Sequence, residues 1–226
     1  MKTFGIIVAM EKEIVHFKEI FNCTKVHNIC NISFYEGFYL DNKIVFTKAG
    51  IGKVNAAVAT TLLIEHFSPS LVINTGIAGG YSKELKPLDI VVADKVFYSD
   101  VDMTSPIAGA YKYGQIEGLP DGFETSYNLL NNIDDCKIGS ILTGDQFVDN
   151  YEKCDSLVKK YFDKQNVLAF DMESGSIAQI CTLNKIDFII MRAISDIIGS
   201  TNEFDYLTFS TQAVEKVSKK VLEMIK

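Results

Sequence analysis

The sequence of 226 residues has a single arginine, three histidines and five cysteines, and these scarcities narrow its possible functions. The cysteines are odd in number, widely spaced and never arranged as Cys-x-x-Cys; they stand at positions 23, 30, 136, 154 and 181. Such a pattern favours neither a disulfide framework nor a zinc site, and the histidines add no ligand spacing. We therefore expect a protein of the reducing cytoplasm.

The chain also lacks a basic cluster and an apolar run of membrane length. Its formal net charge is −7 and its lysines are dispersed, whereas nucleic acids and anionic membranes are bound by concentrated positive charge. The apolar segment 3–10 meets Glu11-Lys12-Glu13 without a small-residue cleavage site. This segment predicts a buried strand and no signal peptide. We expect neither nucleic acid nor a membrane as partner.

Apolar runs typical of buried strands alternate with amphipathic segments, and 47% of the residues are hydrophobic. Strands are predicted at 3–10, 29–37, 43–48, 71–75, 89–98, 138–143, 167–171 and 186–194. Helices are predicted at 11–21, 52–66, 124–132, 150–163, 173–183 and 206–225. This alternation over residues 1–226 predicts one three-layer α/β domain with a mostly parallel or mixed sheet.

A long connection at residues 105–123 interrupts the alternation. It is rich in glycine and proline and contains Tyr111 and Tyr113. Loops longer than about 15 residues inside a compact domain are usually functional or disordered. The tyrosines favour a packed role, and we expect this loop at a subunit interface.

The single arginine points to a binding site. Arg192 stands at the polar end of the apolar run 186–191, four residues before Asp196. Its guanidinium offers a planar fork of donors that lysine cannot copy. Because open α/β sheets bind ligands at strand ends, Glu173 and Asp196 are predicted to face one pocket.

The acidic residues differ in how strongly they indicate catalysis. Asp196 is followed by Ile197 and Ile198, and apolar surroundings raise the pKa of a carboxyl so that it can serve as an acid near neutral pH. Glu13 and Glu173 stand near the starts of predicted helices. There, an acidic residue can simply complement the helix dipole.

Two glycine-containing segments are candidates for ligand loops. Gly50-Ile51-Gly52-Lys53 lacks the Ser or Thr of a phosphate loop and the third glycine of a dinucleotide fingerprint, so it predicts a turn that opens a helix. Gly76, Gly79 and Gly80 follow strand 71–75. They allow either a close backbone approach to a ligand or a plain turn. Phe147 suits either a core position or stacking on a planar ligand.

Eight segments occur in an order that is informative as a set. They are 5–13, 50–54, Asn74-Thr75-Gly76-Ile77-Ala78-Gly79-Gly80, 100–104, Tyr113-Gly114-Gln115, Thr143-Gly144-Asp145-Gln146-Phe147, Asp171-Met172-Glu173 and 192–196. Together they resemble the 5′-methylthioadenosine/S-adenosylhomocysteine nucleosidases, of the purine nucleoside phosphorylase-like superfamily, over nearly the whole chain. The resemblance implies a three-layer αβα sandwich with a mixed twisted central sheet. It also implies a cytoplasmic homodimer without metal or organic cofactor, which hydrolyses small nucleosides in methionine salvage.

The resemblance also implies roles for individual residues. Asp196 matches the acid that protonates N7 of adenine, and Glu13 matches the group that activates water. One acid and one carboxylate acting on opposite faces of a sugar is the logic of inverting glycoside hydrolysis. Further matches are Met172 and Glu173 at the ribose, Phe147 stacking on adenine, Val148 at the adenine edge, Gly79 at a backbone contact, Arg192 and Ser195 in support, Phe204 closing over the ligand, Ile51 and Ile77 among the substrate contacts, and Met103 and Tyr111 from a partner subunit.

The chain departs from the family pattern in three places. Ile77 stands where serine is frequent, the segment 104–113 is longer than usual, and the segment 197–204 is shorter. The longer segment bears on the pocket for the 5′-alkylthio group, so a nucleosidase for another purine nucleoside, such as a futalosine-type compound, stays open.

Two other functions are disfavoured. Related phosphorylases bind phosphate with an arginine where this chain has Asn74, and Ile77 supplies no hydroxyl, so hydrolysis is favoured over phosphorolysis. A non-catalytic storage protein on the same fold would be expected to lose its acidic residues. Here Glu13, Glu173 and Asp196 are all present.

Overall fold

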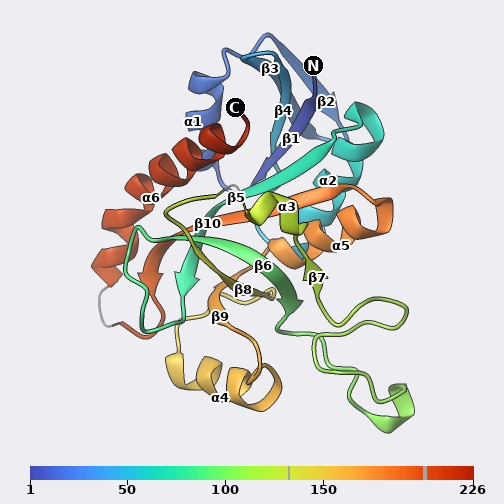
Figure 1. Cartoon of the computed structure of the whole chain (residues 1–226), viewed down its shortest axis with the longest axis vertical. Helices are drawn as coiled ribbons and strands as arrows, with labels where there is room; N and C mark the ends of the chain where they lie inside the picture. The colour runs from blue at the N-terminus through green and yellow to red at the C-terminus, as the bar shows by residue number, and fades with distance from the viewer. Residues whose placement is uncertain (132, 201–202) are drawn as a thin grey trace.

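The computed structural model describes residues 1–131, 133–200 and 203–226, without the side chains of residues 127 and 203–208. Within this part of the chain, ten strands form one mixed sheet (Figure 1). They are β1 (Thr3–Val8), β2 (Lys25–Ile29), β3 (Ile32–Tyr39), β4 (Asn42–Lys48), β5 (Leu71–Gly80), β6 (Ile90–Tyr98), β7 (Phe123–Glu124), β8 (Lys137–Thr143), β9 (Val167–Asp171) and β10 (Asp187–Ile197). The prediction of an α/β chain with a mixed sheet is confirmed.

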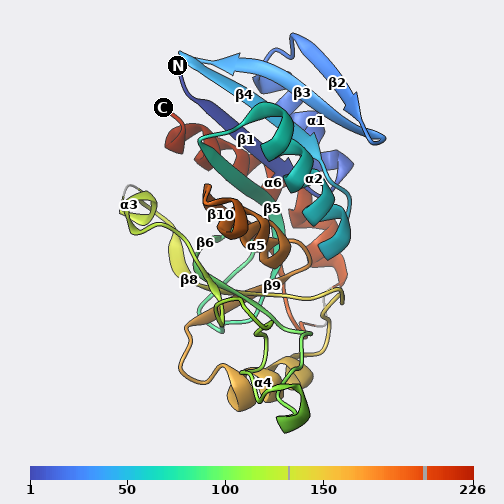
Figure 2. The same cartoon turned by 90° about the vertical axis from the view of Figure 1, so that its right-hand side faces the viewer.

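Helices cover both faces of the sheet (Figure 2). They are α1 (Glu11–Ile20), α2 (Lys53–Phe67), α3 (Tyr127–Leu130), α4 (Tyr151–Tyr161), α5 (Ser174–Asn184) and α6 (Glu203–Met224), with a 3₁₀ turn at Pro106–Ala108. Helices α2 and α5 pack together on one face, and α1 and α6 pack together on the other. Among the described residues, no helix is long and apolar enough to cross a membrane.

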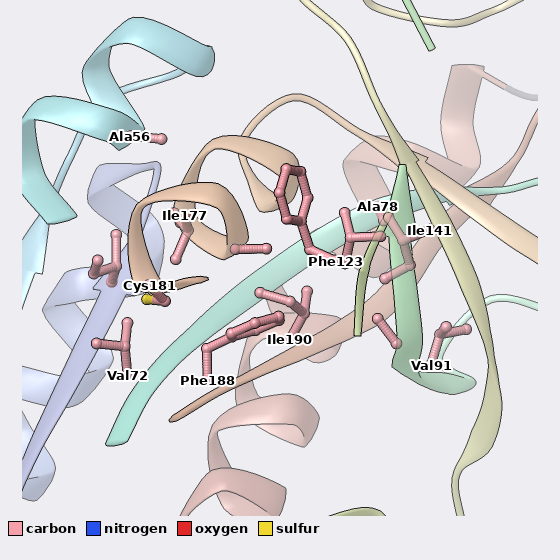
Figure 3. Packing of buried hydrophobic residues seen from close by; sticks show 14 of the residues in the cluster. Ala56, Val72, Ala78, Val91, Phe123, Ile141, Ile177, Cys181, Phe188 and Ile190 are labelled. Carbon is pink, nitrogen blue, oxygen red and sulfur yellow. The ribbon is translucent and has the colours of Figure 1, made fainter. Parts of the chain in front are cut away.

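The alternation of side chains along the strands explains why both faces are apolar. In β1, Ile7 packs into the cluster beneath α2 and α5, whereas Ile6 and Val8 pack into the cluster beneath α1 and α6. Figure 3 shows the first cluster, where Phe188 of β10 lies close to Cys181 of α5. Strands buried on both faces read as continuous apolar runs, which is why they were recognisable in the sequence.

Five strands close into a ring, which the sequence did not indicate. Strand β5 pairs in parallel with β10 along most of its length, and at Gly79 and Gly80 it pairs antiparallel with β9. Strand β10 also pairs with β6, and β6, β8 and β9 are joined in parallel. Because β5 and β9 overlap only at their carboxyl ends, the segment 171–173 is brought beside β5 and β10.

Several predicted boundaries were wrong for identifiable reasons. Strand β5 does not end at residue 75, because its glycines continue to pair with β10, and β10 likewise runs on to Ile197. The helix predicted at 124–132 is instead the short strand β7 followed by α3. Strand β2 was missed because its hairpin turn uses Cys30 and Asn31, both with positive φ, and not the usual Asn-Gly or Asp-Gly pair.

The contact between α2 and β1 offers a test of the packing. Leu63 is fully buried, and a Cβ added at Gly5 would lie 2.6 Å from its Cδ2 atom. We expect Leu63→Ala to lower the free energy of unfolding by about 2–5 kcal/mol, because it removes buried methyl groups and leaves a cavity. Leu40→Ala, at a residue 66% exposed, is the control and should change it by less than about 0.5 kcal/mol. Denaturant titration measures both, and equal effects would contradict the packing described.

Candidate active site

A cavity of about 130 Å³ opens where the carboxyl ends of β5, β9 and β10 meet. Eleven of the residues singled out in the sequence line it: Glu13, Ile51, Ile77, Gly79, Phe147, Val148, Met172, Glu173, Arg192, Ser195 and Asp196. They come from segments spread over almost the entire chain. The ring of strands is what gathers them in one place.

Glu13 lies in the first turn of α1 and is buried, with 1% of its surface exposed. Its Oε2 accepts hydrogen bonds from the backbone N–H groups of Ala9 (2.9 Å) and Met10 (2.8 Å), and its Oε1 accepts one from Ile77 (3.2 Å). The carboxylate therefore caps its own helix and also faces the cavity. Burial raises the pKa of Glu13, although Arg192 and these hydrogen bonds act in the opposite direction.

Arg192 is buried at the centre of a polar network. Its Nε and Nη2 donate to Asp171 Oδ2 at 2.9 and 2.6 Å, and Nη2 also donates to Asn74 Oδ1 at 2.7 Å and reaches Glu173 Oε2 at 3.4 Å. Two carboxylates, Asp171 from β9 and Glu173 from the turn that follows it, are thus paired with one guanidinium. Buried charges need such pairing because they have lost their contact with water. Bonds of this kind fix the planar group in one orientation.

Gly76 makes this network possible. It lies opposite Arg192 in the β5–β10 register and has φ +151°. A Cβ added there would stand 2.8 Å from Arg192 Nη1 and would collide with Glu13 Oε1. Only glycine leaves room for the two charged groups to approach across the strand. The glycine segment after residue 75 therefore continues the strand and is not a plain turn.

Glu173 is held from two sides. It precedes α5, and its Oε1 accepts a hydrogen bond from the backbone N–H of Gly52 at the start of α2 (2.9 Å), while Arg192 approaches Oε2. Burial raises the pKa of Glu173 to about 7, against the opposing effect of Arg192 and with a further rise from Asp171. The cavity therefore contains a carboxyl that titrates near neutral pH.

A β-bulge presents two successive side chains to the cavity. In the pairing of β10 with β5, Ile194 faces Ala78 and Asp196 faces Gly79, so Ser195 is the extra residue. Bulges re-aim side chains and are frequent beside active sites. Ser195 Oγ donates to Asp196 Oδ1 at 2.5 Å, which fixes one oxygen of that carboxyl.

The segment after β8 forms one wall of the cavity. Phe147 borders the cavity although it is 71% exposed, and the next residue, Val148, also lines the cavity. Ile51, 54% exposed, borders it from the turn before α2. Large apolar side chains at the rim of a polar cavity suit a ligand with a planar or apolar part.

Two residues that the resemblance assigned to a partner subunit do not line this cavity of the single chain. Met103 and Tyr111 are absent from its lining; they lie on the long loop, where the backbone N–H of Tyr111 donates to Met103 O at 3.2 Å. The side chain of Phe204 lies outside the described residues.

Sequence reasoning missed three residues of the network. Asp171 was seen only as part of the Asp-Met-Glu segment, although it is the main partner of Arg192. Asn74 was noted only because related phosphorylases have an arginine at this position, and its role as a partner of Arg192 was not predicted. Gly52 was interpreted as part of a turn. The hydrogen bond from its backbone N–H to Glu173 could not be predicted, because the only indication in the sequence is a glycine at the start of a helix.

The ring of strands and the buried carboxylates define a member of the phosphorylase superfamily, whose family model matches residues 3–226. A curated relative from Oceanobacillus iheyensis, named 5′-methylthioadenosine/S-adenosylhomocysteine nucleosidase, is 38% identical over 232 residues, covering 99% of each chain. Within the superfamily, the chain belongs to the family of 5′-methylthioadenosine/S-adenosylhomocysteine nucleosidases.

Two solved structures extend the comparison. The fold is similar to that of the nucleosidase of this name from Neisseria meningitidis in complex with methylthio-immucillin-A, with a TM-score of 0.92 and 34% identity, covering 100% of this chain and 99% of that chain. It is also similar to native futalosine hydrolase of Helicobacter pylori, with a TM-score of 0.90 and 28% identity, covering 99% and 97%.

The raised pKa of Glu173 predicts a pH dependence of stability. The folded protein keeps a proton that the unfolded chain releases between about pH 4.5 and 7. The stabilisation is therefore fully present below pH 4.5 and is lost as the pH rises through 7. Relative to Glu173→Gln, the parent should lose roughly 2–4 kcal/mol of unfolding free energy over this range.

Urea titrations at a series of pH values measure this difference. Glu65→Gln, at an exposed position on α2, is the control and should follow the parent at every pH. A parent curve parallel to that of Glu173→Gln would show that Glu173 ionises as in the unfolded chain.

Proposed function

We propose that this protein hydrolyses the N-glycosidic bond of 5′-methylthioadenosine and S-adenosylhomocysteine, releasing adenine and the corresponding thioribose. The observation that carries the proposal is that Glu13 and Asp196, from α1 and β10, line one cavity. Glu13 is bonded to the N–H of Ile77, and Asp196 is paired with Gly79. These two positions on β5 lie two residues, or about 7 Å, apart, so the two carboxyls are held at separate points of the cavity. An acid and a base on opposite faces of a sugar need to be separated in this way.

Asp196 is the proposed acid. It donates a proton to N7 of adenine, and the C1′–N9 bond then breaks with its electron pair passing to the neutral base. Ser195 Oγ donates to Asp196 Oδ1 at 2.5 Å, which orients the carboxyl. General acid catalysis of this kind contributes roughly 10²–10⁴ in rate.

Glu13 is the proposed base. It takes a proton from the attacking water as the oxygen bonds to C1′ of the oxocarbenium-like sugar. Its buried position keeps its pKa raised, so that it accepts a proton readily. Glu173 and Met172 hold the ribose, and Arg192 fixes Glu173 and lies near Glu13, where it limits the build-up of negative charge.

In this proposal the adenine ring is held by the segment after β8 that forms one wall of the cavity. Phe147 stacks on adenine, while the backbones of Val148 and Gly79 contact the ligand and Ile77 fills the space where a serine is frequent. Water is preferred to phosphate as the nucleophile, because Arg192 is the sole cation among the described residues that line the cavity. Arg192 is also already paired with Asp171, whereas binding of phosphate needs available cationic donors.

A second purine nucleoside is the competing candidate, since the fold is nearly as similar to that of a futalosine hydrolase. Turnover of methylthioadenosine, S-adenosylhomocysteine, adenosine and futalosine, followed by chromatography of the products, separates the two. Preference for futalosine would replace the proposed substrates but keep the chemistry. Adenine release that requires phosphate and forms a sugar 1-phosphate would overturn hydrolysis.

The protein is proposed to act as a homodimer. Ile51, Val54 and Val58 form an apolar strip on the turn before α2 and its first half, and they are 54%, 73% and 44% exposed. Because Ile51 also borders the cavity, a second copy on this strip would reach the substrate. Met103 and Tyr111 of the partner's long loop are proposed to make that contact.

The cytoplasm is the proposed compartment. All five cysteines are free thiols. Disulfides persist in oxidising compartments, so unpaired cysteines on the surface and in the core suit a reducing one.

Removal of either proposed catalytic group tests the mechanism. Asp196→Asn should lower kcat by about 10²–10⁴-fold, because the amide has no proton of suitable acidity for N7. Glu13→Gln should lower kcat by a similar factor while the dissociation constant for methylthioadenosine changes less than about tenfold. Adenine release and calorimetry measure the two effects. Activity within a few-fold of the parent in either variant would remove that residue from the mechanism.

Charge introduced on the apolar strip tests the assembly. Val54→Glu should convert the dimer to a monomer, because a carboxylate cannot be buried unpaired in an interface, and activity should fall with it. Val26→Glu, at a residue of β2 that is 49% exposed, is the matched control and should remain dimeric and active. Sedimentation velocity decides the outcome, and a monomeric parent with full activity would contradict the proposal.

A further inference from the structure

Three charged side chains are linked next to the cavity without lining it. Lys53, the first residue of α2, donates from Nζ to Asp100 Oδ1 at 2.7 Å, and its backbone N–H donates to Asp145 Oδ1 at 2.8 Å. The backbone N–H of Asp145 in turn donates to Asp100 Oδ2 at 2.9 Å. We refer to Lys53, Asp100 and Asp145 as the α2 clip.

The clip joins two segments that border the cavity to a third that leads into the long loop. Asp145 begins the wall that carries Phe147, and Asp100 begins the segment that leads to Met103. Lys53 fixes the start of α2, where the preceding residue, Gly52, gives its N–H to Glu173. The junction is tightly packed: Gly52 has φ +96°, and a Cβ added to it would lie 3.0 Å from Asp145 Oδ1.

The Lys53–Asp100 pair is more than surface decoration. Its side chains are only 22% and 17% exposed, and Nζ lies 5.2 Å from the ring centroid of Tyr98. A lysine so enclosed has lost most of its freedom and holds its partners in one geometry.

We propose that the α2 clip positions Glu173 and the Phe147 wall for catalysis, an inference that rests on the proposed nucleosidase function. Lys53, Asp100 and Asp145 are positioning residues that act through Gly52 and the segment 145–148. With the clip intact, the Gly52 N–H group stays directed at Glu173 Oε1. Without it, the start of α2 and the wall separate, and that hydrogen bond is lost.

Loss of the clip has a signature that general destabilisation lacks. Glu173 is faced by Gly52 of the turn before α2, Arg192 of β10, Asp171 of β9 and Glu13 of α1. The bond from Gly52 lowers the pKa of Glu173, whereas the two other carboxylates raise it. A carboxyl deprived of the Gly52 bond will therefore titrate at higher pH.

The test compares Lys53→Met and Asp100→Asn with a matched control, Lys95→Met. Lys95 pairs with Asp121, its side chain is also 22% exposed, and its Nζ lies 5.3 Å from the centroid of Phe97. The pH dependence of kcat/KM for methylthioadenosine is measured for each variant. Thermal unfolding shows that each is folded.

Each clip variant should lower kcat/KM by about 10- to 100-fold and move its acidic limb to higher pH. The double variant should be no worse than the single ones, because both break one unit. Lys53→Arg, which retains the ion pair, should recover most of the activity, and Lys95→Met should match the parent. An equal loss in Lys95→Met, or a loss without movement of the acidic limb, would overturn the proposal.

Failure of the proposed function gives a different result. If the parent cleaves no nucleoside, the nucleosidase assignment falls, and the clip is judged by urea titration across pH. Lys53→Met must then move the Glu173-dependent loss of stability to higher pH while Lys95→Met leaves it in place. If both variants follow the parent, the clip does not position Glu173.

Discussion

The pairing of Arg192 with the buried carboxylates is the interaction on which this site depends. One guanidinium lies among Asp171, Glu173 and Glu13, all nearly inaccessible to water. Removing Arg192 would leave buried carboxylates without a counter-charge, which is far more costly than the pairing itself. The ring closure of the strands, the glycine at position 76 and the overlap of β5 with β9 all serve to let these groups meet.

The site also shows how one backbone can give different properties to similar side chains. Glu13 accepts three backbone N–H bonds, Glu173 accepts one and faces an arginine, and Asp196 is bonded by the adjacent serine. Each carboxyl therefore has its own surroundings. Different surroundings are what allow one carboxyl to act as an acid while another acts as a base.

Much of the fold could be predicted from the sequence, because its strands are buried on both faces and therefore appear as continuous apolar runs. The ring closure was not readable, since it depends on which strand edges meet and not on local pattern. In the site, Arg192 and Asp196 were recognisable from their place at the end of an apolar run. Gly52 and Asn74 were not, because a backbone N–H carries no sequence signal and a single amide in a strand is ambiguous.

The bulge at Ser195 makes the length of β10 as important as its composition. In a regular strand, neighbouring side chains point to opposite faces, so serine and aspartate could not both reach one ligand. The extra residue suspends that alternation at a single point. Deleting Ser195 would restore a regular ladder in which Asp196 still lies opposite Gly79, but the second side chain on that face would be gone. A more regular sheet would thus keep the carboxyl of Asp196 but lose the serine that orients it.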